Sequence, residues 1–275
     1  MIVSKIVGGL GNQLFQYAYG MSIAKKNNTE LRVDIRAYPF KSPHVYLLDH
    51  LTATRPANAE FTDSLITTGA RKFLHLWKPS HIVYTGSKFE HKYMDVGDNI
   101  YLEGYWASEN YFKHIRSELL SAISMRRHFT ESYSSFDSII KSSEDSVSIH
   151  IRRGDYLLQG IECTPKYYKN ALSIISDMCN GEPDLFVFSD DIEWARNNFN
   201  GAGYRTTFVG GYGWDAHQDL SLMRLCRYHI TANSTFSWWG AWLSDYKNKV
   251  VVTPRKWFKI PYDYDSLIPQ GWIRI

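Results

Sequence analysis

The chain has 275 residues, of which 44% are hydrophobic and 21% are charged, and its net charge is +3. This length is enough for one large domain or two compact ones. The small net charge argues against a protein that binds nucleic acid through a strongly basic face. The three cysteines, Cys163, Cys179 and Cys226, are widely spaced, so they indicate reduced thiols in a reducing compartment rather than a disulfide framework.

The N-terminal segment predicts a strand–helix–strand unit. Residues 2–7 form a short apolar run that lacks the features of a signal peptide. A helical pattern follows from Leu14 to Ala24, with apolar residues mostly three and four positions apart, and residues 31–35 predict a second strand. No window approaches the roughly 18 apolar residues of a membrane span. We therefore expect a soluble, cytoplasmic protein.

The middle of the chain is less regular. Prolines break the stretch from 36 to 100 into short pieces, and residues 100–106 then predict a strand that runs into a loop. A helix is expected from about 110 to 124. Residues 128–145 are polar and rich in serine, which indicates a linker in or near this segment. We therefore divide the chain into an N-terminal half, residues 1–140, and a C-terminal half, residues 141–275.

The C-terminal half alternates strands and helices, which predicts a mostly parallel sheet with helices on both faces. Thr164 is the expected N-cap of the first helix, and Pro165 takes its first position. The predicted strands are 146–151, 185–188, 205–209, 229–232 and 250–253. The predicted helices are 165–178, 192–198, 219–227 and 234–243.

Two adjacent arginines follow the strand that ends at Ile151. In open α/β sheets, ligands bind beyond the carboxyl ends of the strands. The fork of Arg152 or Arg153 suits phosphate oxygens, Gly154 permits a close turn, and Asp155 can hold one guanidinium in place. A surface cluster of salt bridges is the alternative. The position at a strand end favours phosphate recognition.

Three hydroxyl side chains surround the start of the predicted helix at 234–243. Ser234, Thr235 and Ser237 follow Asn233 directly after a strand. Simple capping needs only one of them, and the N-terminus of a helix is itself a site suited to anions. Together with the arginine pair, this segment favours a second contact with phosphate.

Ser189, Asp190 and Asp191 also follow a predicted strand. A carboxylate here could accept hydrogen bonds from ribose hydroxyls or from the N1–H and N2–H edge of guanine. It could instead hold a divalent metal, or it could cap the next helix. The spacing of the residues does not separate these three readings.

The glycine-rich loop from Gly8 to Gln13 superficially resembles a dinucleotide-binding fingerprint, with Gly9 and Gly11 in place and Asp34 ending the next strand. In such sites a third glycine allows the helix to pack closely on the strand, but here Leu14 occupies that position. The match is therefore weak. Asn12 and Gln13 are better suited to hydrogen bonds with a sugar.

Other catalytic signatures are absent from the sequence. It has no GxxxxGK(S/T) loop, no HExxH motif and no GxSxG elbow, which argues against a P-loop kinase, a zinc hydrolase and a serine hydrolase. His217 and His229 stand alone and are interpreted as structural. Aromatic residues make up 15% of the chain. Most of them are expected in the core, and some could line a sugar site.

The ordered motifs resemble the bacterial α-1,2-fucosyltransferases of glycosyltransferase family 11. The resemblance extends from residue 8 to about residue 258, although residues 36–95 carry no matching motif. Its four segments are Gly8 to Ala18, His150 to Tyr156, Phe186 to Asp191 and Ala232 to Trp242.

The resemblance implies an α/β, GT-B-like fold of two Rossmann-type lobes with a cleft between them. The GDP-fucose site would lie mostly in the C-terminal lobe, and the last residues of the chain could pack back on the N-terminal lobe. It also implies inverting transfer of L-fucose to the 2-hydroxyl of a terminal β-galactose, with no metal and no cofactor beyond the donor substrate.

The same resemblance implies roles for particular residues. Arg152 would grip the β-phosphate and stabilise the departing GDP, with Arg153 and Asp155 in support. His150 and Asp190 would lie on the guanine side. The remaining donor contacts would come from Ser234, Thr235, Phe236, Gly9, Gly11 and Asn12. The proton acceptor stays open between Asp155, Glu103, Glu109 and no base at all.

Three other functions compete with this reading. A transferase could use a UDP- or CMP-linked donor, and an NAD(P)-dependent oxidoreductase could use the N-terminal glycine loop, although that leaves the arginine pair unexplained. A non-catalytic carbohydrate-binding protein would account for the aromatic content alone. The resemblance itself favours synthesis of O-antigen or another surface glycan, on a lipid-linked acceptor that could bring the protein to the inner membrane face.

Overall fold

The structure is a computed structural model that describes residues 1–38, 44–52, 80–84, 88–124, 131–179, 181–210, 216–257 and 265–275. It divides into two compact units. The first consists of residues 1–123 with 265–268, and the second consists of residues 124–264 with 269–275. Most of the proline-broken stretch from 36 to 100 lies outside the described residues, so its predicted short pieces are not described.

The first unit contains a four-stranded parallel sheet in the order β2-β1-β4-β3. The strands predicted near residues 2–7, 31–35 and 100–106 are confirmed, and β3 is an additional edge strand that pairs with β4. The bounds are β1 Ile2–Lys5, β2 Leu31–Asp34, β3 Ser80–Tyr84 and β4 Ile100–Gly104.

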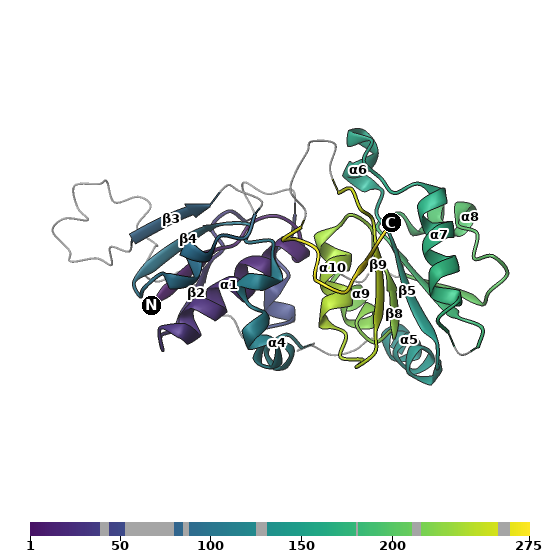
Figure 1. The fold of residues 1–275 in the computed structure, drawn as a ribbon, viewed down its shortest axis with the longest axis horizontal. Helices are drawn as coiled ribbons and strands as arrows, with labels where there is room; N and C mark the ends of the chain where they lie inside the picture. Colours follow the sequence, from purple (N-terminus) through teal and green to yellow (C-terminus); the bar gives the residue numbers. More distant parts are fainter. Residues whose placement is uncertain are drawn as a thin grey trace. The chain divides into compact units, whose positions relative to one another are not determined.

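Helix α1, Leu10–Lys26, follows β1 and packs against the sheet (Figure 1). The close approach between helix and strands occurs at Gly20. A Cβ atom added there would lie 2.8 Å from the Leu31 side chain and 3.1 Å from Cβ of Ser4. The small residue that a strand–helix unit needs for tight packing is therefore Gly20, which lies farther along α1 than the glycine loop.

The helix expected from 110 to 124 is only partly confirmed. Two short 3₁₀ helices, Glu109–Tyr111 and Lys113–Ile115, precede the α-helix α4, Arg116–Ala122. The break occurs at Phe112, whose φ of −147° is not helical. Phe112 is fully buried, so core packing of this aromatic side chain outweighs continuation of the helix.

A cluster of aromatic side chains fills the core of the first unit around Trp106. The indole is fully buried and stacks on Tyr19 and Tyr84 with ring centroids 4.1 and 5.1 Å apart. Tyr93 and Tyr111 meet it edge-on. These aromatic residues therefore belong to the core, which is the role that the composition favours for most of them.

The second unit contains a six-stranded parallel sheet in the order β10-β9-β8-β5-β6-β7. The five predicted strands are confirmed, and β10 adds a two-residue edge strand. The bounds are β5 Ser146–Ile151, β6 Asp184–Ser189, β7 Thr206–Val209, β8 Tyr228–Ile230, β9 Val250–Thr253 and β10 Ile273–Arg274.

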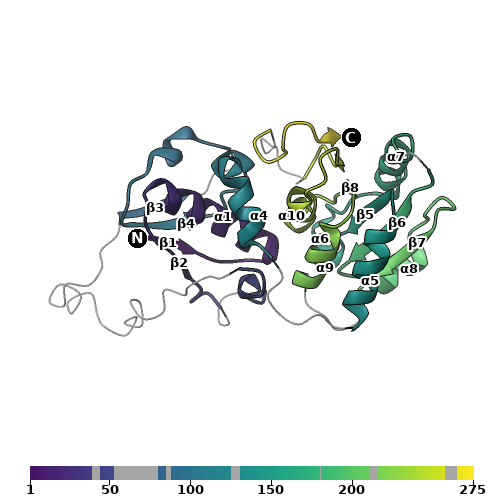
Figure 2. The same cartoon turned by 90° about the horizontal axis from the view of Figure 1, so that it is seen from below.

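Helices cover both faces of this sheet (Figures 1 and 2). Helices α7 and α8 pack on one face with the side chains of Val147, Ile149 and Ile151. Helices α5 and α9 pack on the other face, with Phe186 and Phe188. The bounds are α5 Glu131–Ser142, α6 Gly154–Gln159, α7 Pro165–Ser176, α8 Ile192–Asn198, α9 Ala216–Met223 and α10 Thr235–Leu243.

Most of the serine-rich segment that indicated a linker is the helix α5. Its buried residues Tyr133 and Ile140, with Phe136 between them, lie on one helical face and pack with β6 and α9. Because of this packing, the division between the units falls at residues 123 and 124, whereas the sequence analysis placed it at 140. Residues 265–268 belong to the first unit, where Oγ of Ser266 accepts a hydrogen bond from the backbone N–H of Phe89.

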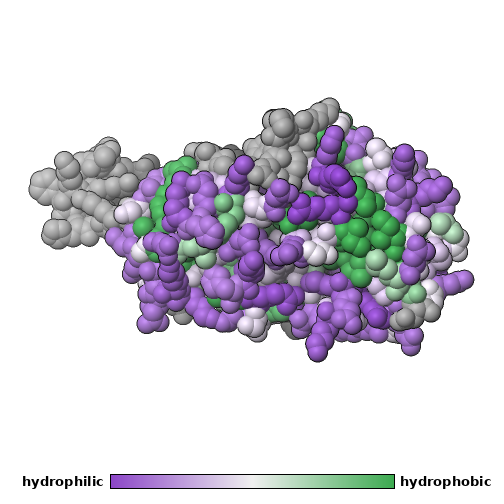
Figure 3. Space-filling view, viewed as in Figure 1, coloured by the Kyte–Doolittle hydropathy of each residue, from purple (hydrophilic) through white to green (hydrophobic). Residues whose placement is uncertain are grey.

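The face drawn in Figure 3 is mostly hydrophilic, and hydrophobic side chains gather on the second unit beside α7 and the C-terminal end of the chain. In the part of the chain that the structure describes, no helix is long and apolar enough to cross a membrane.

Candidate functional site

The candidate site begins where β5 leaves the sheet of the second unit. All six residues of β5 are buried, and their side chains alternate between the two faces. Ile151 faces α7 and α8, whereas His150 faces the opposite side, with its ring 5.3 Å from that of Phe236 in α10. The chain then presents Arg152 and Arg153 at the carboxyl edge of the sheet before α6 begins.

Arg152 is held by two carboxylates. One Nη atom donates to Asp155, three residues ahead in α6, and the other lies 3.0 Å from Oδ2 of Asp190. Its side chain keeps 26% of its surface exposed. The guanidinium is therefore fixed in direction but remains accessible, as a phosphate ligand must be.

Arg153 is fixed more completely than its neighbour. Its Nε donates to Oδ2 of Asp191 at 3.2 Å, and its guanidinium carbon lies 3.5 Å from the centroid of the Trp194 ring. Its backbone N–H donates to Oδ1 of Asp190 at 2.8 Å. With its side chain only 15% exposed, Arg153 serves first to bind the end of β5 to the end of β6.

The two aspartates after β6 have separate roles. Asp191 caps α8, because its side chain accepts a hydrogen bond from the backbone N–H of Trp194 at 3.2 Å. Both carboxylate oxygens of Asp190 face the arginine segment. Among the described residues, no group of three or more His, Cys, Asp or Glu side chains is placed to hold a metal ion.

The start of α10 is the second predicted contact with phosphate. Ser234 is the N-cap, and its side chain accepts a hydrogen bond from the backbone N–H of Phe236 at 3.3 Å. Ser237 is buried and bonds to the backbone of Ala232. Thr235 is half-buried in the first turn. Two of the three hydroxyls are therefore engaged in local structure, whereas Thr235 is the most exposed residue of the three.

Asn233 connects this helix start to the loop before α7. It is almost fully buried, and its Nδ2 donates to the backbone oxygens of Ile161 at 2.9 Å and of Trp257 at 2.7 Å. Its own backbone oxygen accepts a hydrogen bond from the Tyr156 hydroxyl in α6. Asn233 thus ties the start of α10 to α6 through its backbone oxygen and to the loop before α7 through its side-chain amide.

His150 lies beneath the site. Burial, with a further contribution from the nearby charge of Arg152, lowers the pKa of its imidazole from 6.5 to about 3. The ring is therefore neutral at physiological pH. Its Nδ1 is buried and has no hydrogen-bond partner among the described residues.

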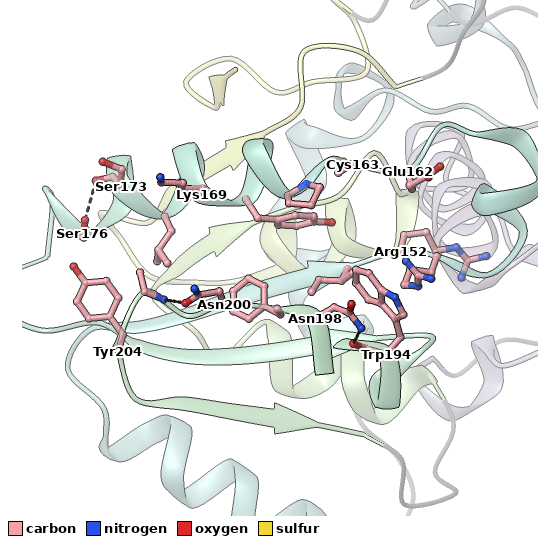
Figure 4. Close-up of a pocket in the computed structure, with 17 residues that line it drawn as sticks. Arg152, Glu162, Cys163, Lys169, Ser173, Ser176, Trp194, Asn198, Asn200 and Tyr204 are labelled. Carbon is pink, nitrogen blue, oxygen red and sulfur yellow. Dashed lines mark hydrogen bonds between the residues drawn. The ribbon is translucent and has the colours of Figure 1, made fainter. Parts of the chain in front are cut away.

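A pocket of about 460 Å³ opens beside the two arginines on the face that α7 and α8 cover (Figure 4). Its apolar floor includes Tyr168, Leu172 and Phe199, and Lys169 and Asn200 lie on its polar rim. In Figure 4, Arg152, Glu162 and Trp194 lie at one end, while Ser173, Ser176 and Tyr204 lie at the other.

The glycine loop belongs to the first unit. Gly8 has a φ of +80°, a region that favours glycine, and a Cβ atom there would lie 2.9 Å from Nδ2 of Asn12. Gly9 is the N-cap of α1 and supplies no side chain to cap it, and Gly11 is buried in the first turn. The N–H groups at this helix start are thus not capped by a side chain of the N-cap residue.

Gln13 does not serve the role that the sequence suggested. It is fully buried, and its amide donates to the backbone oxygens of Gly8 and Val45 and accepts from the backbone N–H of Leu47. Gln13 therefore holds the loop's backbone, whereas Asn12 remains partly exposed.

Two carboxylates of the first unit are engaged with basic side chains. Asp34 is almost buried, accepts two hydrogen bonds from the Arg36 guanidinium and one from the Tyr101 hydroxyl, and so is not free to bind a ribose. Glu103 pairs with Lys5 and with His81. The bond to Lys5 lowers the pKa of Glu103 below 4.5, which makes this carboxylate a weaker base.

The structure brings the predicted residues of the second unit together at one sheet edge: His150, Arg152, Arg153, Asp155, Asp190, Ser234, Thr235 and Phe236. Gly9, Gly11 and Asn12 lie in the first unit. Sequence reasoning missed Asn233 and Trp194 as parts of the site. The position of Asn233 directly before three hydroxyl residues was a usable signal, whereas nothing in the sequence pairs Trp194 with Arg153.

Comparison with known proteins gives a consistent result. The family model described as "Glycosyl transferase family 11" matches residues 1–275. An Escherichia coli protein named alpha-1,2-colitosyltransferase is 31% identical over 296 residues, which cover 100% of this chain and 99% of that protein.

Two other relatives align over a smaller share of their length. The Escherichia coli O-antigen biosynthesis glycosyltransferase WbnK is 38% identical over 148 residues, 51% of this chain and 48% of that protein. Galactoside alpha-(1,2)-fucosyltransferase 1 of Saimiri boliviensis boliviensis is 26% identical over 251 residues, 86% of this chain and 63% of that protein. The chain thus spans less than two thirds of these two.

Solved structures show the same fold at low identity. The NodZ alpha-1,6-fucosyltransferase soaked with GDP-fucose matches with a TM-score of 0.50 at 15% identity, over 88% of this chain and 91% of that one. POFUT1 in complex with GDP matches with a TM-score of 0.52 at 13% identity, over 91% and 97%. These matches confirm the predicted GT-B-like α/β fold. The cleft between its lobes stays a prediction.

Proposed function

The chain belongs to glycosyl transferase family 11, and on that premise we propose that it transfers L-fucose from GDP-fucose to the 2-hydroxyl of a terminal β-galactose. The observation that carries this proposal is the accessible guanidinium of Arg152, fixed by Asp155 and Asp190 at the carboxyl edge of the sheet. A strand-end arginine held in this way suits the diphosphate of a nucleotide sugar.

Arg152 supplies the main electrostatic contribution to the reaction. In an inverting transfer, the acceptor oxygen approaches the anomeric carbon opposite the diphosphate, and negative charge grows on the departing GDP. A guanidinium that is already fixed in place stabilises that charge without reorganising during the step. Thr235 and the backbone N–H groups at the start of α10 add a second contact with the same anion.

The other residues of the second unit support this contact. Asp155 is engaged with Arg152, so it braces the guanidinium rather than accepting the acceptor's proton. His150 and Ser234 shape the floor of the site, where His150 stays neutral and Ser234 caps α10. Phe236 packs over the imidazole.

The glycine loop of the first unit contributes the fucose side of the donor site. Gly9 leaves the start of α1 without a side chain, so a sugar can approach the backbone closely there, whereas the buried Gly11 supports the first turn of the helix. Asn12 supplies the partly exposed amide. The proton acceptor stays open in this proposal: Glu103 is paired with Lys5, and a transition state with strong oxocarbenium character needs little help from a base.

A second candidate donor differs from fucose by one hydroxyl. The Escherichia coli relative that aligns over its whole length is named for colitose, which is fucose without its 3-hydroxyl. A site that hydrogen-bonds a substrate hydroxyl rejects the deoxy analogue strongly, whereas a site without such a contact does not. Comparing the rates of transfer from GDP-fucose and GDP-colitose can therefore identify the donor sugar.

The proposal is tested by measuring GDP release from GDP-fucose and GDP-colitose with lactose and a panel of β-galactosides. We expect release that depends on the acceptor, and product analysis should place the sugar on the 2-hydroxyl of galactose. Release of GDP only from GDP-colitose would show that the donor sugar is colitose instead of fucose. Thermal stabilisation by GDP but not by UDP, CMP or NAD would exclude the rival donors and the oxidoreductase. Sugar binding without GDP release would identify a carbohydrate-binding protein.

The biological setting that we propose is synthesis of O-antigen or another surface glycan in the cytoplasm. The WbnK relative is named for O-antigen biosynthesis. An acceptor carried on a lipid would bring the enzyme to the inner face of the membrane by weak, peripheral contact. The transfer needs no metal or further cofactor in this scheme, so activity should persist in excess EDTA.

A further inference from the structure

One aromatic side chain of the first unit stands apart from the buried cluster around Trp106. Tyr105 follows β4 directly and keeps 54% of its surface exposed. The other residues from 101 to 110 are buried or partly buried. Among the residues that the structure describes, the Tyr105 hydroxyl has no hydrogen-bond partner and its ring contacts no other aromatic ring. The loop after β4 therefore presents a single large aromatic surface to solvent.

The backbone on both sides of Tyr105 is tightly fixed. A Cβ atom added to Gly104 would lie 2.7 Å from the backbone oxygen of Tyr84 and 3.0 Å from the Trp106 indole. Trp106 itself has a φ of +53°, in the left-handed region that bulky residues rarely adopt. Such a conformation costs about 1–3 kcal/mol and persists where packing enforces it, here the stack of the indole on Tyr19 and Tyr84. Strained positions of this kind cluster at ligand sites, so the fixed display of Tyr105 points to a ligand.

Tyr105 lies at the carboxyl edge of the first unit's sheet. β4 pairs in parallel with β1, with Leu102 opposite Ser4, so both strands end at this edge. Lys5 and Glu103, the next residue of each strand, form an ion pair. The glycine loop follows the end of β1, and Tyr105 follows the end of β4. Because ligands bind beyond the carboxyl ends of parallel strands, the glycine loop and Tyr105 border the same ligand region of this unit.

We propose that the ring of Tyr105 is the platform on which the β-galactose ring of the acceptor packs. The inference rests on the proposed function, which places the fucose of the donor at the glycine loop. The acceptor's 2-hydroxyl must reach the anomeric carbon of that fucose, so the galactose ring lies beside the glycine loop, where Tyr105 stands.

The chemistry of galactose suits such a platform. Its axial 4-hydroxyl lies on one face of the ring, which leaves the C–H groups of C3, C4 and C5 together on the other face. That apolar face packs on an aromatic ring, while the tyrosine hydroxyl at the ring's edge stays free to bond a sugar hydroxyl. A tyrosine fixed by its neighbours also loses little conformational entropy when the sugar binds.

Steady-state kinetics of the full chain with GDP-fucose and lactose test this contact. We expect Tyr105→Ala to raise the KM for lactose about tenfold, the scale of losing one aromatic contact with its buried area, and to leave the KM for GDP-fucose unchanged. Tyr105→Phe and Tyr105→Trp keep a ring and should keep most of the affinity for lactose. Tyr246→Ala is the matched control, since Tyr246 is a 42% exposed tyrosine of the second unit that the proposal does not use.

Calorimetry with GDP separates a role in binding the acceptor from a structural role. Substitution of an exposed side chain changes stability little, so GDP affinity and the melting temperature of Tyr105→Ala should match those of the wild type. A merely structural role would lower kcat and weaken the binding of both substrates. An unchanged KM for lactose in Tyr105→Ala, or equal losses for lactose and GDP-fucose, overturns the inference. A wild-type chain that transfers fucose to no β-galactoside overturns the proposed function itself.

Discussion

A Cβ atom added to Gly154 would lie 2.6 Å from Oδ2 of Asp190, closer than side chains approach in real structures. The same Oδ2 lies 3.0 Å from the guanidinium of Arg152. The absence of a side chain at position 154 is therefore what lets the carboxylate after β6 reach the arginine after β5.

The first prediction follows from this contact. Gly154→Ala should displace the Asp190 carboxylate and turn Arg152 away from its direction, with a loss of turnover of about ten- to a hundredfold. Steady-state assays on the accepted donor would measure the change. Gly97→Ala is the matched control, since a Cβ there meets nothing within 4 Å. Equal activity in both variants would show that the space left by Gly154 beside Asp190 is not needed for catalysis.

Arg152 should be the most sensitive residue of the site. Arg152→Ala should lower turnover by two or more orders of magnitude, the scale of removing one fixed donor from a developing negative charge. Lysine should restore only part of the rate, because it cannot bind two carboxylates and a phosphate in one plane.

The control for Arg152 is another arginine paired with an aspartate. Arg205 binds Asp184 at the far end of β6, and its side chain is 73% exposed. Arg205→Ala should keep full activity. If Arg152→Ala retained near wild-type turnover while binding donor normally, its assignment to the leaving diphosphate would be lost.

Much of the second unit could be predicted from the sequence because its signals are local. The apolar runs at Val147 and Leu185, and the Thr164–Pro165 start of α7, each specify an element within a few residues. The structure bears out that start, since the Thr164 side chain accepts a hydrogen bond from the backbone N–H of Tyr167.

The two strands that escaped prediction depend on distant partners. β3 is largely exposed and is defined by its pairing with β4, and β10 is two residues that pair with β9. Helix α5 was hidden because serines surround its buried Tyr133 and Ile140. The spacing of those two residues by seven was the available signal.

The site shows the same division between local and distant information. The arginine pair could be predicted as a site from the sequence alone, because two adjacent arginines directly after a strand are unusual. Its organisation was not visible, because Asp190 lies 38 residues from Arg152 and Trp194 lies 41 residues from Arg153. Only the register of β5 with β6, which pairs Ile151 with Ser189, places them together.

Asn233 should matter more for the stability of the fold than for direct contact with a ligand. Asn233→Ala removes the partner of two backbone oxygens, those of Ile161 and Trp257. Each buried group left without a partner costs about 1–3 kcal/mol, so the free energy of unfolding should fall by a few kcal/mol. Chemical denaturation would measure it.

Asn197→Ala is the matched control for this variant. Among the residues that the structure describes, its Nδ2 donates only to the backbone oxygen of Glu193 on the exposed side of α8, so its removal should change stability by about 0.5 kcal/mol or less. A similar small change for Asn233→Ala would mean that the loop before α7 is held by other contacts.

The last prediction concerns pH and two buried histidines. Burial lowers the pKa of His150 and of His229 from 6.5 to about 3. Between these values the unfolded chain binds more protons than the folded chain, so stability must fall as pH decreases from about 6.5. Each histidine contributes a slope that approaches about 1.4 kcal/mol per pH unit within this window.

His229→Leu isolates one of these contributions without altering the arginine site. Denaturant unfolding from pH 7 to pH 5 should show wild-type stability falling on acidification, with the slope reduced by about 1.4 kcal/mol per pH unit in the variant. Asp34 does not interfere, because its pKa lies below 3.8 in the folded chain and its contribution is lost only at lower pH. Parallel curves for the two proteins would show that His229 is protonated equally in both states, and burial would then not control its charge.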